Sequence, residues 1–258
     1  MYKTLNFKID ERGVGYIELN RPNKHNAISS LMINELAILT DIINNNKELR
    51  VVILSGVGPS FCAGADLNWM KAQIDATPSQ RHAQARQLSN MLNKLNTLSK
   101  PLIGLLHGNV FGGGIGLACV CDTVIASKET LFGFTETKLG LIPATIGPYV
   151  LRKMTGAKAR TVFMSSRIFK VDEAKDLNIV NWINLVDSED SILEREINAY
   201  LNCAPEAVAE AKRLAINIVG APSDSELDQA VAMLVKRWES DEAKKGIISF
   251  LNKKNSSD

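Results

Sequence analysis

The sequence contains few cysteines and no long apolar run. Among its 258 residues the only cysteines are Cys62, Cys119, Cys121 and Cys203, and their spacing fits neither a zinc site nor a disulfide framework. Cys119 and Cys121 lie in an apolar stretch, so we expect buried free thiols there. No apolar run reaches the ~20 residues that span a bilayer, and the first residues alternate as in a strand. These absences favour a cytoplasmic protein without a membrane segment.

The sequence also lacks a large net charge and the motifs of several enzyme classes. It has 30 basic and 28 acidic residues, giving a formal net charge of +2, which argues against a nucleic-acid partner. The histidines, His25, His82 and His107, are far apart, so we expect no metal site. His107 is expected to be a hydrogen-bonded structural residue. A serine hydrolase is unsupported because the Gly-x-Ser-x-Gly motif is absent.

Strand and helix patterns alternate along the chain up to about residue 187. Strands are predicted at 51–55, 101–106, 123–126 and 131–134, and as a pair at 5–20 around a turn at Asp10–Gly13. Helices are predicted from Ser29 or Ser30, over 67–98 with a break near Thr77-Pro78, and from Gly112 through Cys119. The first helix should bury Leu31, Ile33, Leu36 and Leu39. This alternation predicts an α/β core with several short parallel strands.

The C-terminal part of the chain shows helical patterns only. Helices are predicted at 204–219 and 223–238, the second with a capping box formed by Ser223 and Glu226. We place the boundary between an α/β core, 1–195, and a helical region, 196–258, near residue 195. A lone soluble domain should not expose the apolar faces of this region, so we expect an oligomer. These faces carry Ala230, Met233, Leu234, Ile247, Ile248 and Leu251.

Two glycine-rich segments each connect a predicted strand to a helix. They are Phe61–Leu67 and Phe111–Gly116. Small residues let backbone N–H groups approach a ligand, and a helix N-terminus adds a favourable dipole for negative charge. Either segment alone is typical of a tight turn, but together they can supply the two donors of an oxyanion hole. A dinucleotide site is not indicated, because Leu117 stands where the third glycine is needed, and no P-loop lysine follows.

A carboxylate, Glu136, follows the apolar segment Leu131–Phe134 and is flanked by glycines. Burial at the end of such a strand would raise the pKa of this carboxyl group and make it a better base near neutral pH. A solvated glutamate on a loop is the alternative that this position alone leaves open.

The ordered set of segments resembles the crotonase (enoyl-CoA hydratase/isomerase) superfamily. The matching pieces are Arg21–Ala27, Phe61–Leu67, His107–Asp122, Phe132–Pro143 and Gly246–Lys254. The resemblance implies an α/β fold, a spiral of ββα units, followed by a helical region that builds trimers, often paired into hexamers. It also implies an acyl-CoA thioester substrate and no separate cofactor, since coenzyme A is part of the substrate.

The resemblance implies roles for particular residues. The N–H groups of Ala65 and Gly113 would hold the thioester carbonyl, and Glu136 would move protons. Residues Lys24, His25 and Ala27 lie in the loop that contacts coenzyme A. The backbone of Ala63, Asp66 and Leu67 would hold its adenine side. In the helical region, Phe250 and Lys253 would contact the coenzyme A, commonly that of a neighbouring subunit.

One position departs from the hydratase pattern. Where typical hydratases carry a first catalytic glutamate, this chain has Gly116, so Glu136 is the only family carboxylate retained. The nearest other carboxylates in sequence are Asp122 and Glu129. We expect Asp122 to fix the end of a helix and Glu129 to lie on a turn. We expect the space beside Gly116 to set specificity by admitting water, or a branched or carboxylated acyl group.

Finer resemblance suggests a branch of the family. Residues Gly64–Lys71 and Leu139–Val150 look like the methylglutaconyl-CoA and geranylglutaconyl-CoA hydratases, which act in leucine and acyclic terpenoid breakdown. The expected function is hydration of a 2-enoyl-CoA, such as 3-methylglutaconyl-CoA. Two alternatives stay open: a Δ3,Δ2-enoyl-CoA isomerase that uses a single glutamate, and a non-catalytic acyl-CoA-binding protein.

Overall fold

The fold is built on a six-stranded mixed sheet with a second, three-stranded sheet beside it. The computed structural model describes residues 2–184 and 192–255, and the side chains of 2–184 and 192–252. The large sheet has the order β1-β2-β3-β4-β6-β9, and the small sheet has the order β5-β7-β8. The strands are β1 Leu5–Ile9, β2 Val14–Leu19, β3 Val51–Gly56, β4 Leu102–Leu106, β5 Asn109–Phe111, β6 Thr123–Ser127, β7 Leu131–Gly133, β8 Ile168–Lys170 and β9 Trp182–Asn184.

The predicted hairpin and the predicted parallel strands are both present. β1 and β2 pair antiparallel around the Asp10–Gly13 turn, in which the Gly13 N–H donates to the Asp10 carbonyl. From β2 to β9 each neighbouring pair in the large sheet is parallel. The first four residues of β3 are buried on both faces, which explains why that run carries no polar alternation. These pairings confirm the predicted α/β fold.

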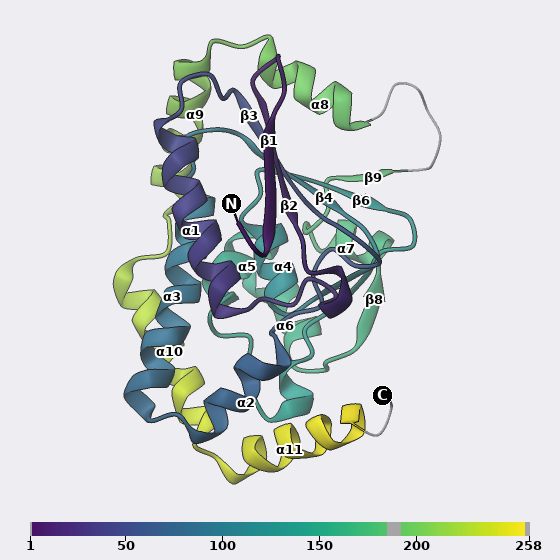
Figure 1. Cartoon of the computed structure of the whole chain (residues 1–258), viewed down its shortest axis with the longest axis vertical. Coiled ribbons are helices and arrows are strands. Elements are labelled where there is room, and N and C mark those ends of the chain that lie inside the picture. Colours follow the sequence, from purple (N-terminus) through teal and green to yellow (C-terminus); the bar gives the residue numbers. More distant parts are fainter. Residues whose placement is uncertain (1, 185–191, 256–258) are drawn as a thin grey trace.

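Helices cover one flank of the large sheet. In Figure 1, α1 and α3 run side by side there, and α10 lies against α3. The helices of the core are α1 Ser30–Asn45, α2 Leu67–Asp75, α3 Pro78–Asn96, α4 Gly113–Cys119, α5 Gly147–Met154, α6 Gly156–Phe163 and α7 Val171–Asp176, with 3₁₀ turns η1 Pro22–Lys24 and η2 Glu136–Leu139.

The predicted start of α1 and the predicted break before α3 are confirmed. Ser29 caps α1 by accepting the Met32 N–H, and Thr77 forms a capping box with Gln80 at the start of α3. The predicted buried face of α1 was wrong at one position. Leu31 is 44% exposed, because the inward-facing stripe passes through Met32 instead.

The C-terminal region forms four helices, α8 Ile192–Leu201, α9 Pro205–Val219, α10 Asp224–Trp238 and α11 Asp241–Asn255. The capping box of Ser223 and Glu226 is present at the start of α10. Helix α8 packs on the sheet through the buried Ile197, which joins β-strand residues such as Val51 and Ile103.

The predicted exposure of the apolar faces in α10 and α11 was wrong for three of the six residues named. Leu234, Ile247 and Leu251 are buried in a second apolar cluster within the same chain, which also contains residues of α2. Of the predicted set, Met233 and Ile248 remain exposed. These helices therefore bury part of their apolar faces within the chain itself.

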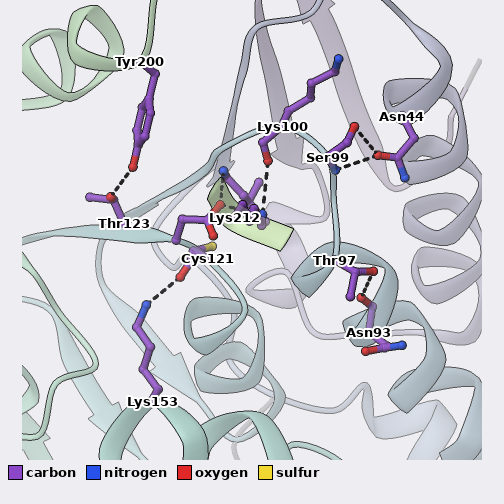
Figure 2. A network of polar contacts seen from close by, with 12 residues as sticks. Asn44, Asn93, Thr97, Ser99, Lys100, Cys121, Thr123, Lys153, Tyr200 and Lys212 are labelled. Atoms are coloured by element: carbon purple, nitrogen blue, oxygen red, sulfur yellow. Dashed lines mark hydrogen bonds and ion pairs between the residues drawn. The ribbon is translucent and has the colours of Figure 1, made fainter. Parts of the chain in front are cut away.

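Polar contacts made by Lys212 attach helix α9 to the core. Lys212 Nζ donates to the Asp122 carboxylate at 2.7 Å and to the Lys100 carbonyl at 3.3 Å (Figure 2). Asp122 also accepts the Leu102 N–H, so it fixes the end of α4 and the start of β4 together. None of the residues in α9 is buried, and its outer face exposes Leu214 (60%), Ile218 (76%) and Val219 (72%). An exposed apolar surface is therefore present on α9, whereas the sequence analysis predicted it on the helices that contain residues 230–251.

In the part of the chain that the structure describes, none of the helices is both long and apolar enough to cross a membrane.

Candidate active site

The two glycine-rich segments lie directly against each other. Cys62 and Val110 form a parallel bridge, with the Cys62 N–H donating to Asn109 and the Phe111 N–H donating to Cys62. A Cβ atom on Gly114 would lie 2.4 Å from the Cys62 carbonyl oxygen, so a larger residue there would push the segments apart. The sequence predicted two donor segments, and the fold places them side by side.

Ala65 presents its N–H group away from the segment with which it pairs. Ile28 pairs with Ala65 in a parallel bridge, in which the Ile28 N–H donates to Gly64 at 2.8 Å and the Asp66 N–H donates to Ile28 at 3.0 Å. Successive N–H groups of an extended segment point to opposite sides, so the Ala65 N–H faces the other way. Ala65 itself is exposed, which leaves this donor accessible to a ligand.

Gly113 supplies a second donor at the N-terminus of α4. It follows Gly112, which has φ = 48°, and it occupies the first turn, where N–H groups have no intrahelical acceptor. A Cβ atom on Gly113 would lie 2.7 Å from the Ile28 Cδ1 atom. The absence of a side chain therefore allows Ile28, the residue that aligns Ala65, to pack directly on this helix terminus.

The Glu136 carboxylate lies at the same helix terminus. A Cβ atom on Gly112 would lie 2.8 Å from Glu136 Oε1, so the carboxylate packs against the backbone that leads into Gly113. Part of the residue reaches solvent, but Oε2 is buried and has no hydrogen-bond partner among the described residues. Desolvation by burial raises the pKa of Glu136 to about 7, and its own backbone N–H opposes that rise. The structure thus favours the desolvated base over the solvated loop glutamate.

We expect kcat/KM to rise with pH up to about 7 and then level off. Glu136 can accept a proton only in its ionised form, and its pKa is raised to about 7. The same burial favours the neutral acid in the folded state, so its contribution to stability is lost as pH rises through about 7. A pH–rate profile and thermal melts of the protein and of Glu136→Gln measure both effects. If kcat/KM no longer changes above about pH 5, Glu136 has the pKa of an ordinary, solvated carboxylate.

The loop predicted to contact coenzyme A packs against the segment containing Ala65. The His25 carbonyl accepts the Ala63 N–H at 2.9 Å, and His25 Nδ1 lies 3.0 Å from Ser60 Oγ. Lys24 and Ala27 flank His25 in this loop; Lys24 is exposed and Ala27 is half-buried. Since the N–H groups of Ala63 and Asp66 are already bonded within the chain, those two donors are not available to a ligand.

Arg21 is a site residue whose role the sequence did not reveal. Its Nη2 atom lies 2.7 Å from Asp66 Oδ2, and its Nη1 donates to the Ala27 carbonyl. Asp66 also caps α2 by accepting the N–H groups of Asn68 and Trp69, so Leu67 begins that helix. Arg21 thereby ties the 24–27 loop to the Ala65 segment. Arg21 belongs to a segment that the family resemblance matched, but its ion pair with Asp66 joins residues distant in sequence and was not predicted.

Helix α11 covers the segment that contains Glu136. Cβ atoms placed on Gly140 and Gly246 would lie within 2.8 Å of backbone atoms of Ala243 and Leu139, respectively, which shows how closely α11 and η2 approach. Phe250 lies half-buried on α11, and the side chain of Lys253 lies outside the described residues. Contact of these two residues with coenzyme A stays a prediction.

The expected open space beside Gly116 is not present. A Cβ atom on Gly116 would lie 2.4 Å from Ile146 Cγ2 and 3.6 Å from Leu92 Cδ1, and Ile146 is only 1% exposed. An isoleucine from the segment after Glu136 therefore fills the volume into which a side chain at position 116 would project. The expectation that this space admits water or a bulky acyl group was wrong, because the filling residue comes from a distant part of the chain.

The other candidates for chemistry are structural. Asp122 is engaged by Leu102 and Lys212, and Glu129 lies exposed beside a turn. His107 Nε2 lies 2.8 Å from the Gly58 carbonyl oxygen, as expected of a structural histidine. Cys119 and Cys121 are buried free thiols, and burial raises the pKa of each. Among the described residues there is no group of three metal-ligating side chains.

Comparison with known proteins identifies the family. The family model described as enoyl-CoA hydratase/isomerase matches residues 10–257. The chain belongs to the enoyl-CoA hydratase/isomerase family. It is 34% identical over 214 residues to a short-chain-enoyl-CoA hydratase of Clostridium acetobutylicum, covering 80% of this chain and 78% of that protein.

Solved structures agree with this assignment. An enoyl-CoA hydratase from Shewanella pealeana is 32% identical, with a TM-score of 0.80 over 98% of this chain and 95% of that one. The AtuE protein of Pseudomonas aeruginosa is 31% identical, with a TM-score of 0.78 over 97% of each chain. The chain therefore has the crotonase fold, including its C-terminal helical region, and is an enzyme of the family that acts on enoyl-CoA thioesters.

Proposed function

We propose that this enzyme hydrates a 2-enoyl-CoA thioester, with Glu136 as the one carboxylate that handles both proton transfers. The observation that carries the proposal is a buried, unpartnered Glu136 Oε2 placed at the α4 N-terminus, where Gly113 presents its N–H. An unpaired buried acceptor is costly, so such an atom indicates a site that binds a donor. A water molecule or an acidic C–H of the substrate would be that donor.

The proposed reaction passes through an enolate. The thioester carbonyl accepts hydrogen bonds from the N–H groups of Ala65 and Gly113. Glu136 removes a proton from water, the hydroxide oxygen bonds to C3, and the electron pair of the double bond moves onto the thioester as an enolate. Glu136 then returns the same proton to C2. Each oxyanion donor is expected to contribute about 10²–10³ in rate, and the base about 10²–10⁴.

Isomerisation is the second candidate, and the packing of Ile146 favours it. In place of a second carboxylate that could hold water, the site has an apolar side chain packed on Gly116. Glu136 alone can remove a proton from C2 of a 3-enoyl-CoA and deliver it to C4, which moves the double bond without water. The two reactions share the enolate and the same base, so only products distinguish them.

One optical assay separates the candidates. The absorbance of the conjugated enoyl thioester falls when crotonyl-CoA is hydrated and rises when a 3-enoyl-CoA is isomerised. A non-catalytic acyl-CoA-binding protein changes neither signal. Loss of absorbance with crotonyl-CoA supports the hydratase. A rise in absorbance with 3-hexenoyl-CoA, together with no change with crotonyl-CoA, would show that the enzyme is an isomerase and not a hydratase.

For the acyl group we propose a short, branched or carboxylated chain, as in 3-methylglutaconyl-CoA. This proposal is supported by the Gly64–Lys71 and Leu139–Val150 segments, which resemble those of the methylglutaconyl-CoA hydratases. Turnover of a panel of linear, branched and dicarboxylic enoyl-CoA substrates tests it.

We also propose that the protein forms a homo-oligomer, a trimer or a dimer of trimers, through α9. Leu214, Ile218 and Val219 form an exposed apolar face on a helix in which none of the residues is buried. Burial of such side chains against a second copy would contribute roughly 25 cal/mol for each Å² of apolar surface removed from water.

We expect the double substitution Leu214→Glu and Ile218→Glu to shift the protein to smaller species in light scattering at micromolar concentration. The control is Met164→Glu, which alters an equally exposed apolar side chain outside the helical region and should leave the assembly intact. A wild-type protein that is a stable monomer would contradict the proposal.

A further inference from the structure

The indole N–H group of Trp69 is a buried donor without an acceptor. Trp69 Nε1 has no hydrogen-bond partner among the described residues, although the atom is inaccessible to solvent. Buried tryptophan N–H groups usually find a partner, because an unpaired donor loses its hydrogen bond to water without replacement. The site so far described does not use this atom.

Trp69 stands close in sequence to the oxyanion segment. It lies in the first turn of α2, the helix that begins directly after Ala65 and Asp66, and its own backbone N–H donates to the capping carboxylate of Asp66. The cap and the Arg21–Asp66 ion pair hold this turn in a fixed position relative to the Ala65 donor. The indole is therefore carried on a rigid element that starts at the proposed thioester site.

The side chain of Trp69 packs against the second apolar cluster, which also contains residues that follow Glu136 in the chain. That cluster joins α2, through Met70, to the segment that follows Glu136, through Leu141 and Ala144. Figure 1 shows α2 and α11 at the same end of the molecule, and α11 closes the cluster. Several apolar residues at its margin are only partly buried, as is expected of a surface that an acyl chain can contact. They are Leu67, Ile74, Leu139, Ile142, Ala230 and Val235.

Two unpaired polar atoms of opposite kind are thus carried on elements that pack on this cluster, Glu136 Oε2 on η2 and Trp69 Nε1 on α2. Glu136 Oε2 is an acceptor, which the reacting proton satisfies, and Trp69 Nε1 is a donor, which needs an oxygen. A saturated hydrocarbon chain would leave that donor unpaired. An acyl group with an oxygen at its distal end would pair it, and sites with a buried polar group discriminate strongly against substrates that cannot pair with it.

We propose that Trp69 is a specificity-determining residue whose Nε1–H donates a hydrogen bond to a carboxylate oxygen at the distal end of the acyl group. The inference rests on the proposed function, because it takes the acyl chain to run from Ala65 and Gly113 along the second apolar cluster. Trp69 is partly exposed through atoms other than Nε1, which places this donor near the surface, where the second carboxylate oxygen can keep its contact with water. The favoured substrates are then dicarboxylic acyl thioesters.

Binding of two saturated thioesters tests the inference without turnover. Glutaryl-CoA carries the distal carboxylate, and butyryl-CoA lacks it. Trp69→Phe keeps an aromatic ring and removes the N–H. We expect isothermal titration to show about a tenfold loss of affinity for glutaryl-CoA and less than about a twofold change for butyryl-CoA, the size expected for one hydrogen bond to a charged acceptor. The matched control is Trp238→Phe, which alters a buried indole of the same cluster and should change neither affinity.

A second measurement uses the unaltered protein and does not depend on the folding of Trp69→Phe. The chain has three tryptophans, so three indole N–H resonances are expected in a ¹⁵N-labelled sample, assignable with Trp182→Phe and Trp238→Phe. Glutaryl-CoA should shift the Trp69 resonance downfield, and butyryl-CoA should not. The inference is overturned if Trp69→Phe loses affinity equally for both ligands or for neither. It is also overturned if glutaryl-CoA leaves the Trp69 resonance unshifted. Crotonyl-CoA turnover tests the proposed function separately, since neither saturated ligand reacts.

Discussion

Glu136→Gln is expected to lower kcat by about 10³-fold or more while binding of the CoA thioester survives. A general base contributes roughly 10²–10⁴ in rate, and here the same group must also return the proton. Glutamine preserves the shape of the side chain but cannot accept or deliver that proton. The backbone donors of Ala65 and Gly113 do not depend on the carboxylate, so the thioester carbonyl should still be held.

The measurement compares kcat for the most active enoyl-CoA of the panel with the affinity for butyryl-CoA. Glu129→Gln is the matched control, because Glu129 is exposed and lies on the turn before β7. Retention of more than about a tenth of the activity by Glu136→Gln would contradict the assignment, because the loss expected for a general base is far larger.

Gly116→Glu is expected to destabilise the protein and abolish most activity unless Ile146 is shortened at the same time. The new Cβ would lie 2.4 Å from Ile146 Cγ2, and both residues are buried, so the core would be overpacked. Overpacking typically costs about 1–3 kcal/mol, and an unpaired buried carboxylate costs more. Ile146→Ala removes the colliding atom and should recover part of the stability, giving a positive coupling in a double-mutant cycle.

The double variant Gly116→Glu/Ile146→Ala would carry two carboxylates in one site. We expect it to favour crotonyl-CoA over 3-methylglutaconyl-CoA relative to Ile146→Ala alone, because like charges in a weakly screened site repel by several kcal/mol at most. The ratio of the two kcat/KM values, together with thermal unfolding, provides the test. An unchanged ratio, or one that moves toward the carboxylated substrate, would remove position 116 from the determinants of specificity and promote the isomerase.

The local patterns of the sequence determined the elements of the fold. Strand alternation indicated the β1–β2 hairpin, Ser29 and Ser223 marked helix starts as capping residues, and Thr77-Pro78 marked the break before α3. Glycine content marked the two donor segments, since their close approach excludes side chains on Gly113 and Gly114. Such features depend on residues near one another in the chain, so they can be recognised without the fold.

The tertiary structure alone decided what fills each space and which polar atoms stay unpaired. Ile146, at the start of α5, packs on Gly116 of α4. Leu234, Ile247 and Leu251 of α10 and α11 are buried within the chain, and Arg21 pairs with Asp66. The unpaired atoms of Glu136 and Trp69 likewise become visible only in three dimensions. The physical reason is that packing volume, desolvation and hydrogen-bond satisfaction depend on neighbours in space, and most of those neighbours are distant in sequence.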